Sequence, residues 1–271
     1  MIDKNGIISV YSNPKKDPDG DSAAKVIGIL EKFGLKCRKT ENVADDLSGT
    51  VLLIVLGGDG TILSVIRNIS DINIPLFSVN IGTLGFLSEV ELNEFEEAVP
   101  MILENKGHIQ ENLMIEAHCA DDVHTAINEF CVLNEDRQKM VHVSVYINGD
   151  RAGRFDADGI IVSTPTGASA YSLSAGGPIV YPNANCILIT PICAHSITAR
   201  PIVVNADDVI TIKSHKGDII LASDWQNRKL YTAENEIKII KSSKAAKFYK
   251  LNEHGFFDRM REKLIYNISR D

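Results

Sequence analysis

Apolar and polar positions along the first third of the chain follow two alternating periods. Short apolar runs predict strands at residues 7–11, 51–56 and 75–79. Apolar residues recur at the helical period over residues 22–33, 61–69 and 91–104, and Ser22 is the expected N-cap of the first helix. The uninterrupted run 51–56 is typical of a strand covered on both faces. Strands that alternate with helices predict right-handed βαβ units on a parallel sheet.

From about residue 108 the pattern becomes that of a β domain. Val141, Val143 and Val145 alternate with His142 and Ser144, and Asn148-Gly149 then gives a hairpin-turn signal. Further strand-like runs cover residues 159–163, 187–190, 209–214, 218–222 and 236–241. Many short strands without intervening helices predict a packed antiparallel β domain.

These patterns predict the fold class and the domain limits. We expect an α/β domain with a parallel sheet over residues 1–104, followed by an all-β, sandwich-like domain over residues 105–250. A helical pattern returns near the end of the chain, where Phe256, Met260 and Leu264 share one face. We expect residues 251–271 to include a helix that returns to the first domain.

Charge and cysteine content narrow the classes of function. Lys and Arg total 28 against 36 Asp and Glu, a formal net charge of −8. This balance argues against a nucleic-acid partner, whose binding depends on a basic surface, but a small nucleotide can still be held by helix N-termini. No apolar run reaches the roughly 18 residues of a membrane span, so no membrane partner is expected. The five cysteines form no CxxC pair, which predicts reduced thiols in a cytoplasmic protein.

The strongest local motif is Gly57-Gly58-Asp59-Gly60-Thr61, directly after the strand predicted at 51–56. Glycines at a strand-to-helix turn let the backbone approach a phosphate, and the helix N-terminus attracts its charge. The carboxylate of Asp59 would repel a phosphate unless it binds Mg²⁺ or takes a proton from an attacking hydroxyl, and both are kinase roles. The alternative is a tight turn that favours aspartate.

A second glycine-containing loop, residues 80–86, follows the next predicted strand. Consecutive strand ends of an open parallel sheet place their loops side by side along one crevice, where ligands bind. Phe86 in this loop suits either stacking on a base or filling the domain core.

Two further segments combine polar residues with apolar surroundings. Asp156 and Asp158 face the same side if their backbone is extended, and the small hydroxylated residues of 163–174 suit recognition of a ribose or an amide. An ordinary Ser/Gly-rich turn is the alternative for the latter. Asn128-Glu129 interrupts an apolar strand predicted at 126–133, where a polar pair is costly to bury without partners. A position at a strand edge is the alternative.

Together, four motifs resemble the signature set of NAD kinases. They are GGDGT at 57–61, NIGTLGF at 80–86, AINE at 126–129 and DGIIVSTPTGASAYSLSAGGP at 158–178, and they occur in family order. The resemblance covers most of residues 50–230. Diacylglycerol kinases, sphingosine kinases and 6-phosphofructokinases share similar glycine-aspartate loops, so the long Ser/Thr/Gly segment with Tyr171 is the specific part. The resemblance, not the composition, names NAD as substrate.

The resemblance implies a role for each matching residue. Asp59 looks like the family's catalytic base, next to Gly60 in the nucleotide site. Asn128 and Glu129 match the pair used on the NAD ribose and phosphate region, and Asp158 matches the carboxylate on the nicotinamide side. The remaining matches are to binding positions: Phe86, Thr166, Ser169, Ala170, Tyr171 and Ser174 in their motifs, Gln226 in a segment similar to the family's SDGQ, and Lys139 as counterpart of a basic residue after the Asn-Glu pair.

The chain departs from the family pattern at a few positions. Ala157 replaces a usual glycine, and Asp156 stands where a basic residue is common, which removes a cation that would neutralise the product phosphate. Ser169 replaces a commoner threonine, and Trp225 follows Asp224 where glycine or another residue is usual.

The resemblance implies an enzyme that moves the γ-phosphoryl of ATP, with Mg²⁺ or another divalent cation, to the adenosine 2′-hydroxyl of NAD. A nucleotide-binding regulator of the same fold, with weak or no turnover, is the alternative that Asp156 keeps open. A lipid kinase would have an exposed apolar or basic patch that faces the membrane, and the net charge and the lack of an obvious amphipathic anchor argue against it. The family also implies a homo-oligomer, dimer or tetramer, in which a neighbouring subunit lends residues to the site. The sequence does not decide whether the phosphoryl donor is ATP or polyphosphate, or whether the acceptor is NAD or NADH.

Overall fold

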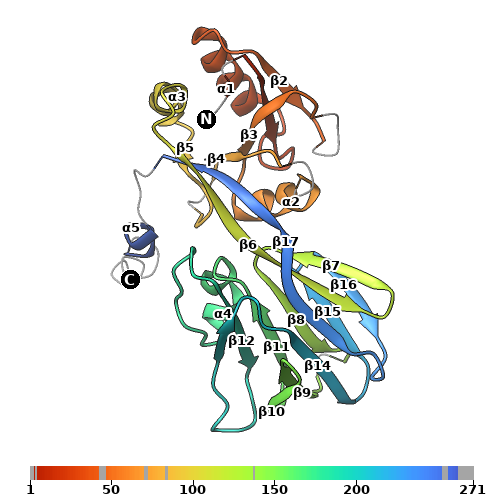
Figure 1. Cartoon of the computed structure of the whole chain (residues 1–271). Helices are drawn as coiled ribbons and strands as arrows, with labels where there is room; N and C mark the ends of the chain where they lie inside the picture. The colour runs from red at the N-terminus through yellow and green to blue at the C-terminus, as the bar shows by residue number, and fades with distance from the viewer. Residues whose placement is uncertain are drawn as a thin grey trace, which may run out of the picture. The chain divides into compact units, whose positions relative to one another are not determined.

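The computed structural model describes residues 3, 5–42, 47–69, 73–82, 85–136, 138–251 and 256–261 (Figure 1). The chain divides into two compact units, one of Met1–Glu111 with Ala246–Asp271 and one of Asn112–Ala245. Both boundaries fall inside long strands, β6 (His108–Cys119) and β17 (Ile237–Lys250), so each of these strands belongs to both units. They lie several residues from the domain limits expected at 104/105 and 250/251.

A parallel sheet forms the centre of the first unit. Its strands are β1 (Ile7–Ser12), β2 (Cys37–Thr40), β3 (Thr50–Leu56) and β4 (Leu76–Asn80), in the order β2-β1-β3-β4. Every pairing along this order is parallel. The short strand β5 (Val90–Glu91) and the end of β17 also pair with β4. The expected α/β domain with a parallel sheet is therefore confirmed.

Three helices cover this sheet: α1 (Asp21–Lys32), α2 (Asp59–Ile69) and α3 (Phe95–Leu103). Apolar side chains of α1 and α3, among them Leu30 and Phe95, pack in one core with Leu52 and Ile54 of β3. α2 contributes no residue to that core, and Figure 1 shows it on the other side of the strands. Alternate residues of β3 are buried on both faces, which accounts for its uninterrupted apolar sequence.

The start of α1 differs from the expectation that Ser22 caps it. Gly20, with φ of 76°, is the N-cap residue and makes no side-chain capping bond. Asp17 caps the helix instead. Its carboxylate accepts hydrogen bonds from the backbone N–H groups of Ser22 at 2.9 Å and Ala23 at 3.1 Å. Ser22 is thus a first-turn residue whose own N–H needs an acceptor.

The second unit contains two antiparallel sheets. One comprises β10 (Asp150–Ala157), β9 (Val141–Ile147), β14 (Ile210–Lys216) and the start of β17, with β6 and β7 (Asp122–Ala126) attached. The other has the order β13 (Ile202–Asn205), β12 (Cys186–Ile192), β11 (Gly159–Ser163), β8 (Glu129–Asn134), β15 (Ile219–Ser223) and β16 (Asn227–Tyr231). Buried side chains of both sheets, such as Val143 and Ile212 of the first and Phe130 and Val162 of the second, form one core. The expected all-β domain is confirmed.

Two turns of this unit bear on the sequence predictions. Asn148 and Gly149 connect β9 to β10 with φ of 51° and 89°, the left-handed pair of a tight hairpin. By contrast, the single strand predicted at 126–133 is wrong, because β7 ends at Ala126 and β8 begins at Glu129.

The remaining elements are short. A 3₁₀ turn at Gly167–Ser169 and α4 (Tyr171–Ser174) follow β11, and α5 (Phe256–Met260) lies near the C-terminus. Leu264 and most of the expected C-terminal helix lie outside the described residues. Among the helices that the structure describes, none combines the length and apolar character needed to cross a membrane.

Candidate active site

Asp59 lies in the first turn of α2, immediately after β3 and the two glycines that follow it. Its carboxylate accepts two backbone hydrogen bonds, from Phe86 N–H to Oδ2 at 2.8 Å and from Leu87 N–H to Oδ1 at 3.1 Å. The loops after β3 and β4 are therefore side by side, as adjacent ends of parallel strands predict. Each carboxylate oxygen keeps lone-pair capacity for a further donor or a metal ion.

Gly85 faces this carboxylate at very short range. A Cβ on Gly85 would lie 1.8 Å from Asp59 Oδ1, closer than any real contact. Only glycine therefore allows the 85–87 backbone to reach Asp59. The side chain of Phe86 is partly exposed rather than buried in the core, so it stays a candidate for contact with a base.

Asn128 and Glu129 lie at a bend whose backbone is held by one carboxylate. Asp224 accepts hydrogen bonds from three successive backbone N–H groups: Ile127 at 3.2 Å, Asn128 at 2.8 Å and Glu129 at 3.1 Å. A strand cannot direct consecutive N–H groups to one acceptor, because they point to opposite edges. The predicted strand is therefore broken here. Asp224 is a residue whose importance the sequence did not reveal.

The carbonyl side of the same bend is held by the loop after β11. Thr164 N–H donates to the carbonyl of Asn128 at 2.9 Å. Gly167 packs so closely that a Cβ would lie 2.1 Å from that carbonyl oxygen. The bend is thus fixed from two segments that are distant in sequence.

Glu129 is buried in this bend, with 2% of its surface exposed. Burial raises the pKa of its carboxyl to about 8, and the negative charge of Asp224 adds to the shift. Among the described residues, Glu129 Oε2 has no hydrogen-bond partner, and neither has the buried Oγ of Ser163. These two residues are directly opposite each other on β8 and β11. Neighbouring buried polar atoms without partners mark a place for a bound ligand atom or water.

The raised pKa of Glu129 predicts a pH dependence of folding. A carboxyl whose folded pKa is about 8, against an ordinary 4.5, contributes stability fully below pH 4.5 and loses it as pH rises through 8. We expect Glu129→Gln to gain stability relative to wild type between pH 6 and pH 9, on the order of a few kcal/mol, since one pKa unit is about 1.4 kcal/mol. Urea unfolding at both pH values measures this difference. Parallel pH profiles for the two proteins would contradict it.

Tyr171 and its neighbours cover the sheet face that carries Glu129. Tyr171 packs against Cys131 and Ile161, and burial raises the pKa of its phenol. The charges of Cys131 and Cys193, then those of Asp158 and Glu129, raise this pKa further, so Tyr171 lies within electrostatic reach of both predicted carboxylates.

The other predicted residues of this loop lie in the turns that lead to Tyr171. The buried Thr166 hydroxyl accepts a hydrogen bond from Asn112 Nδ2 at 3.1 Å, and Ser169 Oγ donates to the Thr166 carbonyl at 3.1 Å. Ala170 is half-buried between the two short helices, and Ser174 is exposed. The hydroxyls of Thr166 and Ser169 are therefore bonded within the second unit, and that of Ser174 lies on an exposed residue.

The sequence matches known proteins over both units. It matches the ATP-NAD kinase N-terminal domain over residues 11–108 and the ATP-NAD kinase C-terminal domain over residues 127–251. The NAD kinase of Thermoanaerobacter sp. is 37% identical over 277 residues, with 95% of this chain and 98% of that protein covered. The NAD kinase of Caldicellulosiruptor saccharolyticus is 32% identical over 258 residues, covering 95% and 99%. The chain belongs to the NAD kinase family.

Solved structures of NAD kinases have the same fold. An NAD kinase from Archaeoglobus fulgidus in complex with ATP superposes with a TM-score of 0.81 at 26% identity, covering 97% of this chain and 98% of that one. Yeast NADH kinase complexed with NADH gives a TM-score of 0.85 at 24% identity, covering 99% and 90%, which shows the shared fold.

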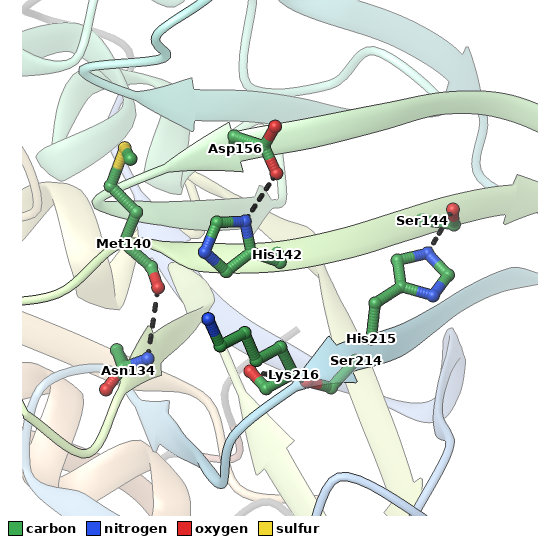
Figure 2. A network of polar contacts seen from close by, with 8 residues as sticks. All are labelled: Asn134, Met140, His142, Ser144, Asp156, Ser214, His215 and Lys216. Atoms are coloured by element: carbon green, nitrogen blue, oxygen red, sulfur yellow. Dashed lines mark hydrogen bonds and ion pairs between the residues drawn. The ribbon is translucent and has the colours of Figure 1, made fainter.

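Asp156, one of the residues at which the chain departs from the NAD kinase pattern, has a partner of its own. His142 Nδ1 lies 2.6 Å from its carboxylate, and Figure 2 shows the two side chains pointing toward one another from β9 and β10. This hydrogen bond lowers the pKa of Asp156. Asp158 lies in the bend after β10, not in a strand, so the extended backbone that would place both carboxylates on one side is absent.

Some predicted NAD kinase residues are not brought beside Glu129. Asp158 precedes β11, whose other end carries Ser163, so Asp158 and Glu129 lie near opposite ends of that strand. Lys139 lies in the turn between β8 and β9, where its ammonium pairs with Asp136 at 2.9 Å and 71% of the side chain is exposed. Gln226 is exposed in the turn after β15.

Proposed function

We propose that this NAD kinase family member transfers the γ-phosphoryl group of ATP to the adenosine 2′-hydroxyl of NAD, giving NADP and ADP. It is a phosphotransferase with an alcohol acceptor. The single observation that carries the proposal is the position of Asp59. This carboxylate is fixed in the first turn of a helix that follows a glycine pair, and its oxygens keep capacity for a substrate proton.

In the proposed reaction Asp59 orients the 2′-hydroxyl and accepts its proton. The hydroxyl oxygen forms a bond to the γ-phosphorus, and the bond from that phosphorus to the oxygen of the β-phosphate breaks. ADP leaves with the bonding electrons. Because phosphoryl transfer requires little covalent help from the protein, fixed positions and charge stabilisation supply most of the rate. Gly60, at the exposed start of α2, leaves room for the donor phosphates.

The residues proposed to hold NAD belong to the second unit. Asn128, Glu129 and Asp158 supply amide and carboxyl groups to ribose hydroxyls and the carboxamide. The 166–174 segment surrounds the adenine and its ribose with small polar groups and Tyr171. Lys139, Asp156 and Gln226 complete the proposed set, and Phe86 belongs to the nucleotide-binding residues proposed for the first unit. Accordingly, ATP is assigned to the domain predicted over residues 1–104 and NAD to that over residues 105–250.

A divalent cation such as Mg²⁺ fits this arrangement as a companion of ATP. The described part of the chain contains no group of three or more acidic, histidine or cysteine side chains that could hold a metal ion. Mg²⁺ commonly keeps several waters and binds one or two carboxylates together with substrate phosphates, and Asp59 would be the protein ligand. When bound, the ion neutralises charge on the donor phosphates.

Incubation with ATP, Mg²⁺ and NAD, coupled to an NADP-specific dehydrogenase, tests the proposed reaction. Formation of NADP that depends on all three components is the expected result. Saturable NAD binding without NADP formation would show the regulatory alternative instead. Parallel reactions with polyphosphate and with NADH define the range of donors and acceptors.

We infer further that the protein is a homo-oligomer, a tetramer on the family's pattern, assembled through the β unit. Two edge strands of the second sheet carry exposed apolar side chains: Val203 on β13 is 53% exposed and Leu230 on β16 is 47% exposed. Covering such edges is a common reason for association. Light scattering should give a mass of two or four chains, and a fully active monomer would contradict the inference.

A cytoplasmic location is proposed because all five cysteines are unpaired.

A further inference from the structure

The turn between β15 and β16 has an unfavourable backbone. Asp224 and Trp225 are both left-handed, with φ of 45° and 59°, and Gln226 N–H closes the turn on the carbonyl of Ser223 at 3.0 Å. Non-glycine residues rarely adopt this conformation, because Cβ crowds the backbone. The hydrogen bonds that Asp224 makes to the 127–129 bend account for its own strain. They do not account for a tryptophan at the next position, where glycine would be unstrained.

The Trp225 ring makes two specific contacts. It meets Tyr171 edge to face, with ring centroids 5.2 Å apart and an interplanar angle of 75°. The guanidinium carbon of Arg228 lies 5.0 Å from the Trp225 ring centroid, a distance that gives a cation–π attraction. Strain of this kind persists where the surroundings compensate it, and it gathers at functional positions. Here the contacts that offset the strain of Trp225 include its cation–π contact with Arg228, which orients that guanidinium.

Strand register places Arg228 on the same sheet face as Glu129. Arg228 is opposite Ala222 on β15, and Ala222 is opposite Cys131 on β8. Glu129 is two residues from Cys131 on the same strand, so its side chain points to the same face. Two strand spacings, roughly 10 Å, separate Arg228 from Cys131 across this face.

The charges on this face favour an anionic ligand at Arg228. Within the described residues Arg228 has no ion pair with a carboxylate, whereas the next residue, Lys229, pairs with Asp122 at 2.6 Å. The nearby acids are Glu129 and Asp224. Burial raises the pKa of the Cys131 thiol, both acids raise it further, and Arg228 is the cation that opposes them. An anionic ligand on this face would therefore meet the Arg228 guanidinium, with which no described carboxylate pairs.

We propose that Arg228, held over the ring of Trp225, binds a phosphate oxygen of the dinucleotide, with Trp225 as its positioning residue. The inference rests on the proposed function, because it takes NAD as the ligand. A guanidinium recognises phosphate oxygens through paired N–H donors, which an ammonium cannot reproduce.

Arg228→Gln tests the phosphate contact by calorimetric titration of NAD without ATP. We expect the Kd for NAD to rise about fivefold to tenfold and its dependence on salt to weaken, while the KM for ATP stays unchanged. Arg228→Lys should recover only part of the loss. Lys229→Gln is the matched control, since it removes a neighbouring charge on the opposite face, and it should leave the Kd within twofold. Equal losses in both glutamine variants would overturn the proposal.

Trp225 is the only tryptophan of the chain, so its emission reports directly on this hairpin. NAD should change the emission saturably at the calorimetric Kd. Trp225→Gly should raise the Kd for NAD severalfold in the wild-type background and little further in the Arg228→Gln background, as expected of a residue that acts through Arg228. Additive losses would overturn the positioning role. If wild-type protein binds no NAD, the proposed function fails; if it binds NAD and Arg228→Gln binds equally well, only this inference fails.

Discussion

Asp59→Asn is expected to lower turnover by at least about a hundredfold, the lower end of what general-base catalysis contributes, while NAD binding stays within a few-fold of wild type. The substitution keeps the shape of the side chain but removes its charge and basicity. Phosphoryl transfer then lacks the group proposed to take the 2′-hydroxyl proton. Steady-state kinetics with the coupled dehydrogenase, together with calorimetric titration of NAD, measure the two quantities.

The structure adds a complication that needs a control. Asp59 accepts N–H groups from both Phe86 and Leu87, and an asparagine amide can accept only through its oxygen. The variant therefore loses stability as well as activity. Asp17→Asn is a matched control, since Asp17 likewise accepts two backbone N–H groups, those of Ser22 and Ala23, in the same unit. It should lose comparable thermal stability and keep its turnover.

A purely structural aspartate at position 59 predicts a different outcome. In that case Asp59→Asn and Asp17→Asn should behave alike, with turnover close to wild type in both. Such a result would remove Asp59 from the catalytic assignment while leaving its link between the two loops intact.

Glu129→Ala should raise the KM for NAD about tenfold to a hundredfold and leave the KM for ATP nearly unchanged. Glu129 Oε2 is buried without a partner among the described residues, so a ligand hydroxyl that pairs with it would itself lose its partner in the variant. An unsatisfied buried polar group costs about 1–3 kcal/mol, which corresponds to this range. Asp158→Ala should act in the same direction, because it removes a hydrogen bond to a charged group.

Asp208→Ala is the control for the Glu129 experiment. Asp208 is an acid of the same unit whose carboxylate binds Asn148 Nδ2 at 2.7 Å and Asn205 N–H at 2.9 Å, so its loss is structural only. The KM for NAD should not change in this variant. If Glu129→Ala weakens NAD and ATP equally, the defect lies in folding, and the assignment of Glu129 to the dinucleotide is wrong.

Local patterns in the sequence were enough to predict most of the fold. The apolar run of β3, the alternation in β9 and the Asn148-Gly149 turn each depend on neighbouring residues only, and each appears where the pattern places it. The prediction that Ser22 caps α1 was wrong. The residue types near the start of a helix do not show which side chain of the preceding loop accepts its free N–H groups. Asp17 does so from five residues away.

The site was harder to predict, because its contacts join distant segments. The break at Asn128 depends on Asp224, which a local pattern cannot reveal. The pairing of Asp156 with His142 can be predicted only when the register of β9 and β10 is known. The exposed position of Lys139 depends in the same way on the path of the turn between β8 and β9. The motif resemblance named Asp59 and Glu129 without this information. The resemblance did not reveal that Glu129 is buried, which is the cause of its raised pKa.

The hydrogen bonds of Asp224 also set the order in which the proposed dinucleotide site can form. Asp224 and Asn128 are 96 residues apart, and the bend at 127–129 has its N–H acceptor only after β15 and its turn have been synthesised. Closing a loop of this length costs chain entropy before any contact repays it, which makes such pairings slow. A nascent chain that ends before residue 224 therefore carries the Asn-Glu pair without the acceptor that shapes it. Competence to bind the dinucleotide should arise late in biosynthesis, after the strands that form the rest of the sheet.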